Sequence, residues 1–355
     1  MIHRRAFLLT PLALLAAERR PNVVLIVARG WRGVSTPWSN DRNLHAPNLA
    51  KFAAGAMVFT RAYSASPSPG PGRSAILTGR FPHVNGSIRD SVPLAKGEVT
   101  LGAALADGGY NAVQGIEAMV KARAPFYAEL LLDAPGNPKS AGAAAIEIRP
   151  NVPAEFKNAR ENLAAYYGRL ADLDDQLGKA LAAAPEGGLV VFTSDSGAQI
   201  GSHGIAGNDL PFEESARVPL AIRFPGVIAA GASDALVSGV DLAPTILALC
   251  GETPFEGIQG RDLSALARGG DGQRPEWVLA EGKIGTPDEW RMLVQGMDKI
   301  TVDARGEVLG LYNLAADPYE MSNRAQDPSQ QLKLDELSAV IRAARSQLLD
   351  FRRRY

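Results

Sequence analysis

The feature that most constrains the fold is a continuous apolar run, Val23-Val24-Leu25-Ile26-Val27, near the start of the chain. A β-branched run without polar alternation is typical of a strand buried on both faces, as in a parallel sheet covered by helices. Two further runs of this kind occur, and stretches with helical spacing alternate with them. The alternation predicts an α/β domain with a mainly parallel sheet between helices. The strand-like runs are 189–193 and 219–224, and the helical stretches are 46–56, 100–108, 161–184 and 241–249.

Beyond Asp271 the pattern changes to short strand-like runs joined by turn residues. An amphipathic helix over 332–351 closes the chain. We therefore expect an α/β domain over 20–270 and a smaller α+β domain over 271–355, with the boundary near the glycine-rich stretch 269–272. The strand-like runs of the second domain are 277–280, 290–295 and 299–302.

The first residues have the order of an export signal: Arg4 and Arg5, then an apolar stretch to Ala17. The apolar stretch is too short for a stable membrane span. The arginine pair resembles a twin-arginine signal, so we expect a signal peptide over 1–17 and a periplasmic or secreted protein. The alternatives are a chance arginine pair in an ordinary signal and a buried N-terminal helix.

Charge and cysteine content exclude several classes of function. The chain has 37 Lys and Arg against 38 Asp and Glu, so its net charge of −1 provides no basic field for nucleic acid or an anionic membrane. A single cysteine, Cys250, excludes an internal disulfide and a cysteine-based zinc site. A lone cysteine can be a nucleophile, but Cys250 follows an apolar helix-like stretch and is most simply a core residue.

A set of motifs, in order along the chain, resembles the type I sulfatases of the alkaline phosphatase superfamily. The resemblance implies a mixed sheet between helices, an active site at the carboxyl ends of strands, and a small C-terminal antiparallel sheet. It also implies hydrolysis of sulfate esters with Ca²⁺ and a formylglycine made from Cys or Ser. The motifs are at 20–27, 45–49, 59–63, 75–82, 192–197, 201–204, 213–220, 241–245 and 311–318.

The metal positions that the resemblance implies are largely replaced. Where the family has paired carboxylates after the first strand, this chain has Arg29 and Gly30. In the second metal segment Asp195 is kept, but its Asn or His partner is Ser196. One carboxylate cannot hold Ca²⁺ tightly, so we expect no metal and no cofactor. We hypothesise that Arg29 pairs with Asp195 in place of the ion; the alternative is that Arg29 points to solvent.

The nucleophile position is also replaced. Aligned on Pro71 and Arg73, the family signature places its Cys or Ser at Pro69, which has no nucleophilic side chain. We therefore predict no catalytic residue, with Ser66 and Ser68, both out of register, as weak alternatives. Two neighbouring glycines, at 70 and 72, lead us to expect a permissive loop here.

Other polar positions of the family are lost as well. Arg73 and His203 remain as a candidate anion-binding pair, although Arg73 is equally suited to bracing a loop. We interpret two further histidines as structural, with His45 leading a helix and His83 forming part of a loop. The family's expected Lys and His residues correspond here to Ile116, Ala118, Gly136 and Asn208.

The sequence favours an exported sulfatase-like protein without the family's catalytic centre, which acts as a binding protein for a small anionic or sulfated ligand. An alternative is an active sulfuric or phosphoric ester hydrolase with an altered site around Ser66, Ser68, Arg73 and Asp195. A further alternative is an accessory subunit that pairs with an active sulfatase.

Overall fold

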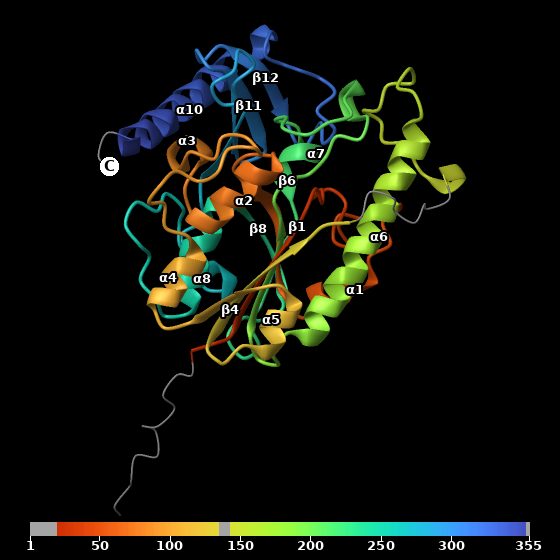
Figure 1. Ribbon diagram of the computed structural model, residues 1–355. Helices are drawn as coiled ribbons and strands as arrows, with labels where there is room; N and C mark the ends of the chain where they lie inside the picture. The colour runs from red at the N-terminus through yellow and green to blue at the C-terminus, as the bar shows by residue number, and fades with distance from the viewer. Residues whose placement is uncertain (1–19, 135–142, 353–355) are drawn as a thin grey trace, which may run out of the picture.

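The computed structural model describes residues 20–134 and 143–352, so the predicted signal peptide and Gly136 lie outside the described residues. Figure 1 shows a central sheet between two layers of helices, with a second, smaller sheet beside it. This architecture confirms the predicted fold class. The strands of the central sheet are β1 (Val23–Ala28), β2 (Met57–Tyr63), β3 (Asn111–Gln114), β4 (Phe126–Leu132), β5 (Leu189–Ser194), β6 (Arg217–Val218), β7 (Leu220–Arg223) and β8 (Gly231–Ser238).

The central sheet is mixed, with strand order β3-β4-β1-β5-β7-β2-β6 and β8 paired to β2. Strand β1 lies between β4 and β5 and runs parallel to both. The register pairs Ala28 with Leu132 of β4 and with Ser194 of β5. The three residues that follow these positions therefore leave the sheet at the same edge.

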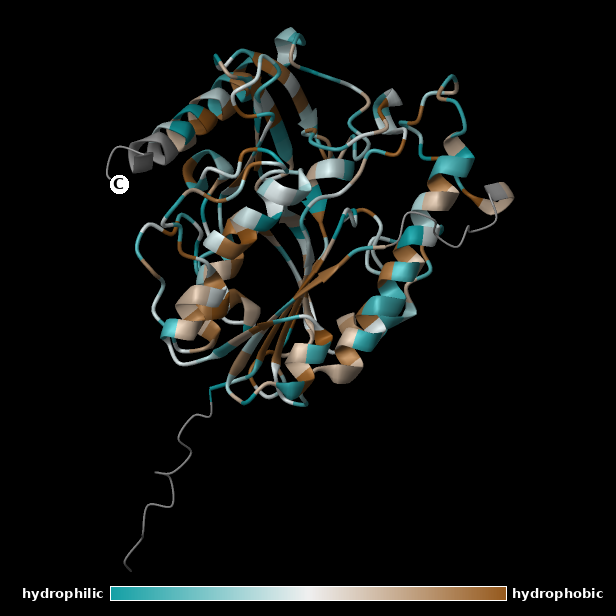
Figure 2. Ribbon diagram, in the orientation of Figure 1, coloured by the Kyte–Doolittle hydropathy of each residue, from teal (hydrophilic) through white to brown (hydrophobic). Residues whose placement is uncertain are grey.

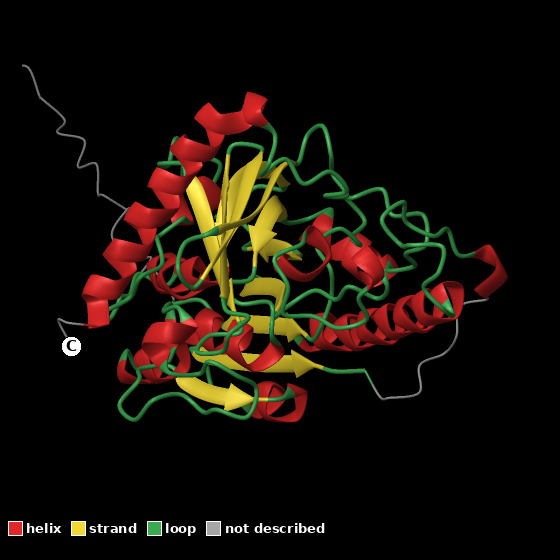
Figure 3. Cartoon of the chain, turned by 90° about the horizontal axis from the view of Figure 1, so that it is seen from above, coloured by secondary structure: helices red, strands yellow, loops and turns green. Residues whose placement is uncertain are grey.

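Alternate residues of β1 contribute to two different cores, as the strand period of two requires. Val23, Leu25 and Val27 pack with α4 (Leu101–Asp107) and α8 (Leu242–Leu249). Val24 and Ile26 pack with α1 (Pro47–Ala53) and α6 (Ala159–Ala183). Figure 2 shows that the central strands are apolar, and Figure 3 shows helices on both sides of them. The helices of this domain are α1 (Pro47–Ala53), α2 (Pro69–Thr78), α3 (Pro82–Asn85), α4 (Leu101–Asp107), α5 (Ile116–Lys121), α6 (Ala159–Ala183), α7 (Glu213–Ala216), α8 (Leu242–Leu249) and α9 (Ser264–Ala267).

The smaller sheet is antiparallel, with strand order β12-β11-β10-β9. Its strands are β9 (Trp277–Gly282), β10 (Trp290–Gln295), β11 (Asp298–Asp303) and β12 (Val308–Asn313), and α10 (Gln331–Arg352) packs on it. The strand-like runs and the closing helix predicted from the sequence are therefore present. None of the helices in the described residues is long and apolar enough to cross a bilayer.

Candidate functional site

The register of β1 brings three charged residues into one row at the carboxyl edge of the sheet. Because Ala28 pairs with Leu132 and Ser194, the residues that directly follow the three strands are Arg29, Asp133 and Asp195. Arg29 therefore leaves the sheet between two carboxylates. The sequence analysis predicted that Arg29 lies beside Asp195, but it did not predict that Asp133 lies there too.

Asp195 is buried, with 1% of its surface exposed, and only one of its carboxylate oxygens is hydrogen-bonded. Its Oδ1 accepts hydrogen bonds from the backbone N–H of Gly30 and from the hydroxyl of Ser196, each at 3.1 Å. Its Oδ2 has no hydrogen-bond donor. Burial raises the pKa of Asp195 to about 7, even though the two hydrogen bonds and Arg29 favour the ionised form.

Arg29 pairs with both neighbouring carboxylates, more closely with Asp133. Its Nη1 lies 3.2 Å from Asp133 Oδ2, whereas its Nε lies 4.0 Å from Asp195 Oδ2. Arg169 of α6 also contacts Asp133, at 3.0 Å. The Arg29–Asp195 ion pair that we hypothesised is present at the outer limit of a direct contact. The side chain of Arg29 is 42% exposed. Its outer part therefore faces solvent, as the alternative interpretation predicted.

The segment around Pro69 is helical, and the predicted permissive loop is wrong. Pro69 begins α2, where a proline is well tolerated because the first helical N–H has no partner inside the helix. Gly72 is needed for packing, since a Cβ there would collide with the backbone oxygen of Asp195. The hydroxyl of Ser64 donates to that same oxygen at 2.6 Å. Helix α2 is therefore fixed against the end of β5.

The two weak nucleophile candidates occupy different environments. Ser66 is buried, and its backbone oxygen accepts a hydrogen bond from Ser64 Oγ at 2.7 Å. Ser68 lies at the start of α2, where its hydroxyl donates to Asp90 Oδ1 at 3.2 Å. The same carboxylate oxygen accepts the backbone N–H of Gly70 at 2.7 Å. Asp90 thus holds the first turn of α2.

Arg73 has a carboxylate partner that sequence reasoning missed. Its Nε donates to Oε1 of Glu129, a buried residue of β4, at 2.9 Å, and its Nη2 also bonds this oxygen. The pair connects α2 to the central sheet. This geometry agrees with a bracing role, and an anion at Arg73 would have to compete with Glu129.

His203 lies in a different group of contacts from Arg73. Its ring stacks on Phe212 with centroids 3.8 Å apart and an angle of 13° between the planes. Its Nε2 is 3.2 Å from Asn151 Nδ2 and 4.0 Å from Glu214 Oε2. Burial lowers the pKa of His203, which favours the neutral ring. Anion binding by Arg73 and His203 together stays a prediction.

Ligand-type atoms of His203, Glu214 and Glu320 lie within 4.8 Å of one another, which would suit a metal ion by residue type. A buried lysine already supplies positive charge to this group. Lys299 Nζ lies 2.8 Å from Glu320 Oε1 and 3.2 Å from Glu213 Oε1, and these carboxylates raise the pKa of Lys299 despite its burial. Since the carboxylates already have protein cations beside them, we assign no metal here.

His45, His83 and Cys250 have structural surroundings. Cys250 is buried at the end of α8, and burial raises the pKa of its thiol to about 11, which disfavours a reactive thiolate. His83 is buried with its Nδ1 2.8 Å from the carboxylate of Glu281. His45 is exposed just before α1.

Comparison with known proteins identifies relatives of this chain. The sulfatase family model matches residues 21–141 and 134–252, which is more than half of the chain. An ulvan-active sulfatase of Formosa agariphila is 24% identical over 420 residues, covering 93% of this chain and 82% of the relative. An arylsulfatase of Clostridium perfringens is 28% identical over 188 residues, covering 50% of this chain and 39% of the relative. The second match therefore spans less than half of that relative.

Solved structures have the same fold. A structure described as a 2-O GAG sulfatase superposes with a TM-score of 0.81 at 20% identity, covering 95% of this chain and 94% of the other. The phosphonate monoester hydrolase of Agrobacterium radiobacter superposes with a TM-score of 0.79 at 19% identity, covering 93% and 96%. At this level of identity the superpositions establish the shared fold.

The buried carboxyl of Asp195 predicts a specific dependence of stability on pH. Its pKa is about 7 in the folded chain against an ordinary value of 3.8, so the folded state binds the proton more tightly. This group therefore makes the chain less stable as the pH rises from about 4 to about 7. We expect Asp195→Asn to raise the free energy of unfolding at pH 8 by on the order of 1–3 kcal/mol.

Chemical denaturation at several pH values between 5 and 8 measures the effect. The difference between Asp195→Asn and the unmodified chain should shrink as the pH falls, and the exposed control Asp107→Asn should show no such trend. A difference that is constant with pH would contradict the raised pKa.

Proposed function

The chain belongs to the sulfatase family, and on that premise we propose that it is a non-hydrolytic member that acts by binding. The supporting observation is the position of Arg29, whose Nε lies 4.0 Å from the buried Oδ2 of Asp195. In this family carboxylates at the end of β1 would hold a calcium ion beside Asp195. Here a guanidinium stands at that place, and the adjacent Gly30 offers only a backbone N–H.

Calcium does not fit the groups that are present. Ca²⁺ takes six to eight oxygen ligands, mostly from several carboxylates. Asp195 is the carboxylate that remains at the family's metal position, and Arg29 would add like charge next to the ion. The nucleophile position is Pro69, the first residue of α2, and proline has no group that could attack a sulfur or phosphorus centre. Both parts of the family's chemistry are therefore missing.

We further propose that the ligand is a small anionic or sulfated saccharide. Arg29 and Arg169 are both partly exposed and share the carboxylate of Asp133, so their outer N–H groups can meet an anion. Guanidinium groups recognise oxyanions through paired N–H donors. Relatives of this chain include an ulvan-active sulfatase, and one similar structure is described in complex with D-glucosamine-2-N,6-O-disulfate.

The non-hydrolytic proposal predicts neither calcium binding nor turnover. We expect the purified chain, after treatment with a chelator, to show no change in Tm on addition of CaCl2. It should release 4-nitrophenol from 4-nitrophenyl sulfate or phosphate no faster than buffer does. Stoichiometric calcium, or turnover that is lost in Ser68→Ala, would instead support the altered active site.

A double substitution provides a positive control for the calcium measurement. Arg29→Asp with Gly30→Asp restores two carboxylates beside Asp195, and a Cβ at Gly30 meets no atom within 4 Å. Gly30 has φ of +72°, a conformation that Asp tolerates better than most residues. The double variant should gain a calcium-dependent rise in Tm, because a ligand that binds only the folded state stabilises it.

The ligand proposal predicts binding that depends on sulfate and on the two arginines. Calorimetric titration with D-glucosamine 6-sulfate should show binding that D-glucosamine does not show. Arg29→Gln and Arg169→Gln should each weaken it by about tenfold, the loss expected for one charged hydrogen-bonding pair. Arg42→Gln, which removes an arginine that is 81% exposed, is the matched control. Equal affinities in all these variants would refute this part.

We also propose that the chain is exported through its N-terminal segment. The support is the arginine pair Arg4-Arg5 followed by the apolar stretch. Expression of the full chain in a Gram-negative host followed by fractionation should find it in the periplasm. Replacing both arginines by lysine should retain it in the cytoplasm, whereas unchanged export would contradict the twin-arginine route.

A further inference from the structure

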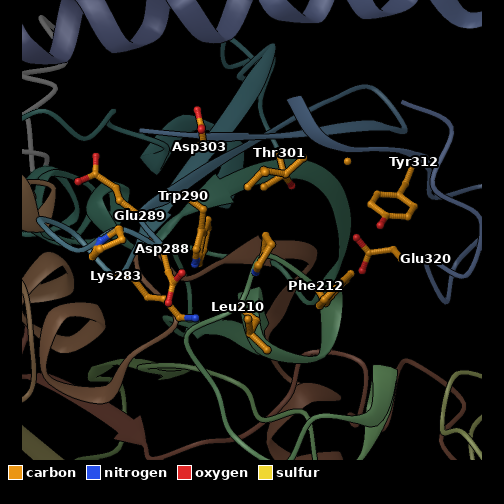
Figure 4. A pocket seen from close by; sticks show the side chains of 14 residues that line it. Leu210, Phe212, Lys283, Asp288, Glu289, Trp290, Thr301, Asp303, Tyr312 and Glu320 are labelled. Atoms are coloured by element: carbon orange, nitrogen blue, oxygen red, sulfur yellow. The ribbon is translucent and has the colours of Figure 1, made fainter. Parts of the chain in front are cut away.

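A cavity of about 480 Å³ lies between the 210–212 segment and the smaller antiparallel sheet. Figure 4 shows its walls, with Leu210 and Phe212 on one side and side chains of β10, β11 and β12 on the other. Arg29, Arg73 and Asp195 are not among the residues that line it. An inference about this cavity therefore does not use the residues on which the proposed function rests.

Three aromatic side chains form much of the wall, and their positions are fixed by contacts. Trp290 is 3% exposed, and its Nε1 donates to the backbone oxygen of Asp209 at 3.2 Å. One face of Phe212 is covered by the His203 ring, and Tyr312 lies 6.4 Å from Phe212 at an angle of 65°. Because a Cβ at Gly310 would lie 2.8 Å from the Tyr312 ring, the absence of a side chain there makes room for this ring.

The charged groups that line the cavity are mainly acidic. Four carboxylates line it, and Lys283 is the one cation among its described lining residues. Cations that neutralise three of these carboxylates, Arg291, Arg305 and Lys299, are not lining residues. Asp288 is exposed and forms no ion pair within the described part of the chain. The carboxylates are those of Asp288, Glu289, Asp303 and Glu320.

Asp288 is therefore the lining carboxylate that is free to attract a cation, because the other three lining carboxylates already have protein cations beside them. An ammonium group is attracted both by carboxylates and by the faces of aromatic rings. The apolar body of the same ligand would gain from contact with Trp290, Phe212 and Tyr312. Concave, mostly apolar cavities with a few polar groups are the usual form of small-molecule sites.

We propose that this cavity binds a small organic cation with a ring-shaped apolar body, such as a cyclic or aromatic amine. The ring packs among the three aromatic side chains, and the ammonium group faces the carboxylate of Asp288. The charge preference is opposite to that of the arginines at the carboxyl edge of the central sheet. The cavity thus selects a different class of ligand from the one proposed for Arg29 and Arg169.

Calorimetric titration of the full chain with three probes of the same ring tests the proposal. At pH 7 benzylamine is a cation, benzyl alcohol is neutral and benzoate is an anion. We expect benzylamine to bind about tenfold more tightly than benzyl alcohol, with benzoate the weakest, as cation–π and carboxylate attraction predict. Equal affinities for the three probes, tighter binding of benzoate, or no binding of benzylamine would overturn the proposal.

Two substitutions at the partly open rim locate the binding without disturbing the core. Asp288→Asn should weaken benzylamine severalfold, because it removes the lining carboxylate that has no ion pair. Lys283→Asn should strengthen it, because it removes the lining cation; Lys283 has φ of +50°, which Asn tolerates. Asp271→Asn removes an exposed carboxylate that does not line the cavity and should have no effect. Failure of either rim substitution to change the affinity would place the cation elsewhere and overturn the proposal, while leaving the non-hydrolytic function untouched.

Discussion

The parallel pairing of β1 with β4 and β5 is the constraint on which the site depends. Strands buried on both faces keep their register because a slip by one residue would exchange the side chains of two apolar cores. This register places Arg29, Asp133 and Asp195 side by side where the strands end. Any residue directly after β1 therefore faces Asp195, whether it is a metal ligand or a guanidinium.

A guanidinium is a weaker partner for Asp195 than a bound dication would be. Its Nε is 4.0 Å from Oδ2, its side chain is partly exposed, and Asp133 competes for its charge. The effect of burial outweighs the effect of Arg29, and the pKa of Asp195 is raised to about 7. A buried charge without a partner is costly, so Arg29 beside Asp195 limits the penalty of burying this carboxylate without eliminating it.

The elements that sequence reasoning predicted are those with a clear apolar pattern. β1, β5 and α6 follow directly from β-branched runs and from helical spacing. β4 escaped prediction because Glu129 interrupts its apolar pattern, and Glu129 is explained by Arg73, which comes from a distant segment. Gly70 and Gly72 of α2 suggested a loop. Their actual role is to allow close packing against Asp90 and Asp195, and these contacts are not visible in the local sequence. Asp133 lies beside Arg29 only because β1 and β4 pair in this register, and no local sequence pattern predicts that pairing.

The cavity lies where the smaller sheet meets the 210–212 segment. A buried group of charged side chains connects these two parts of the chain. Lys299 of β11 contacts Glu213 of α7 and also Glu320, whose Oε2 accepts the backbone N–H of Glu213 at 2.7 Å. Removing one member of such a group strongly destabilises the folded protein, because the remaining charges stay buried without a partner. The group holds Phe212, next to Glu213, opposite Tyr312 of β12. Contacts within the chain therefore hold Phe212 and Tyr312 in place, which lowers the cost of ordering side chains around the ring-shaped ligand that we propose.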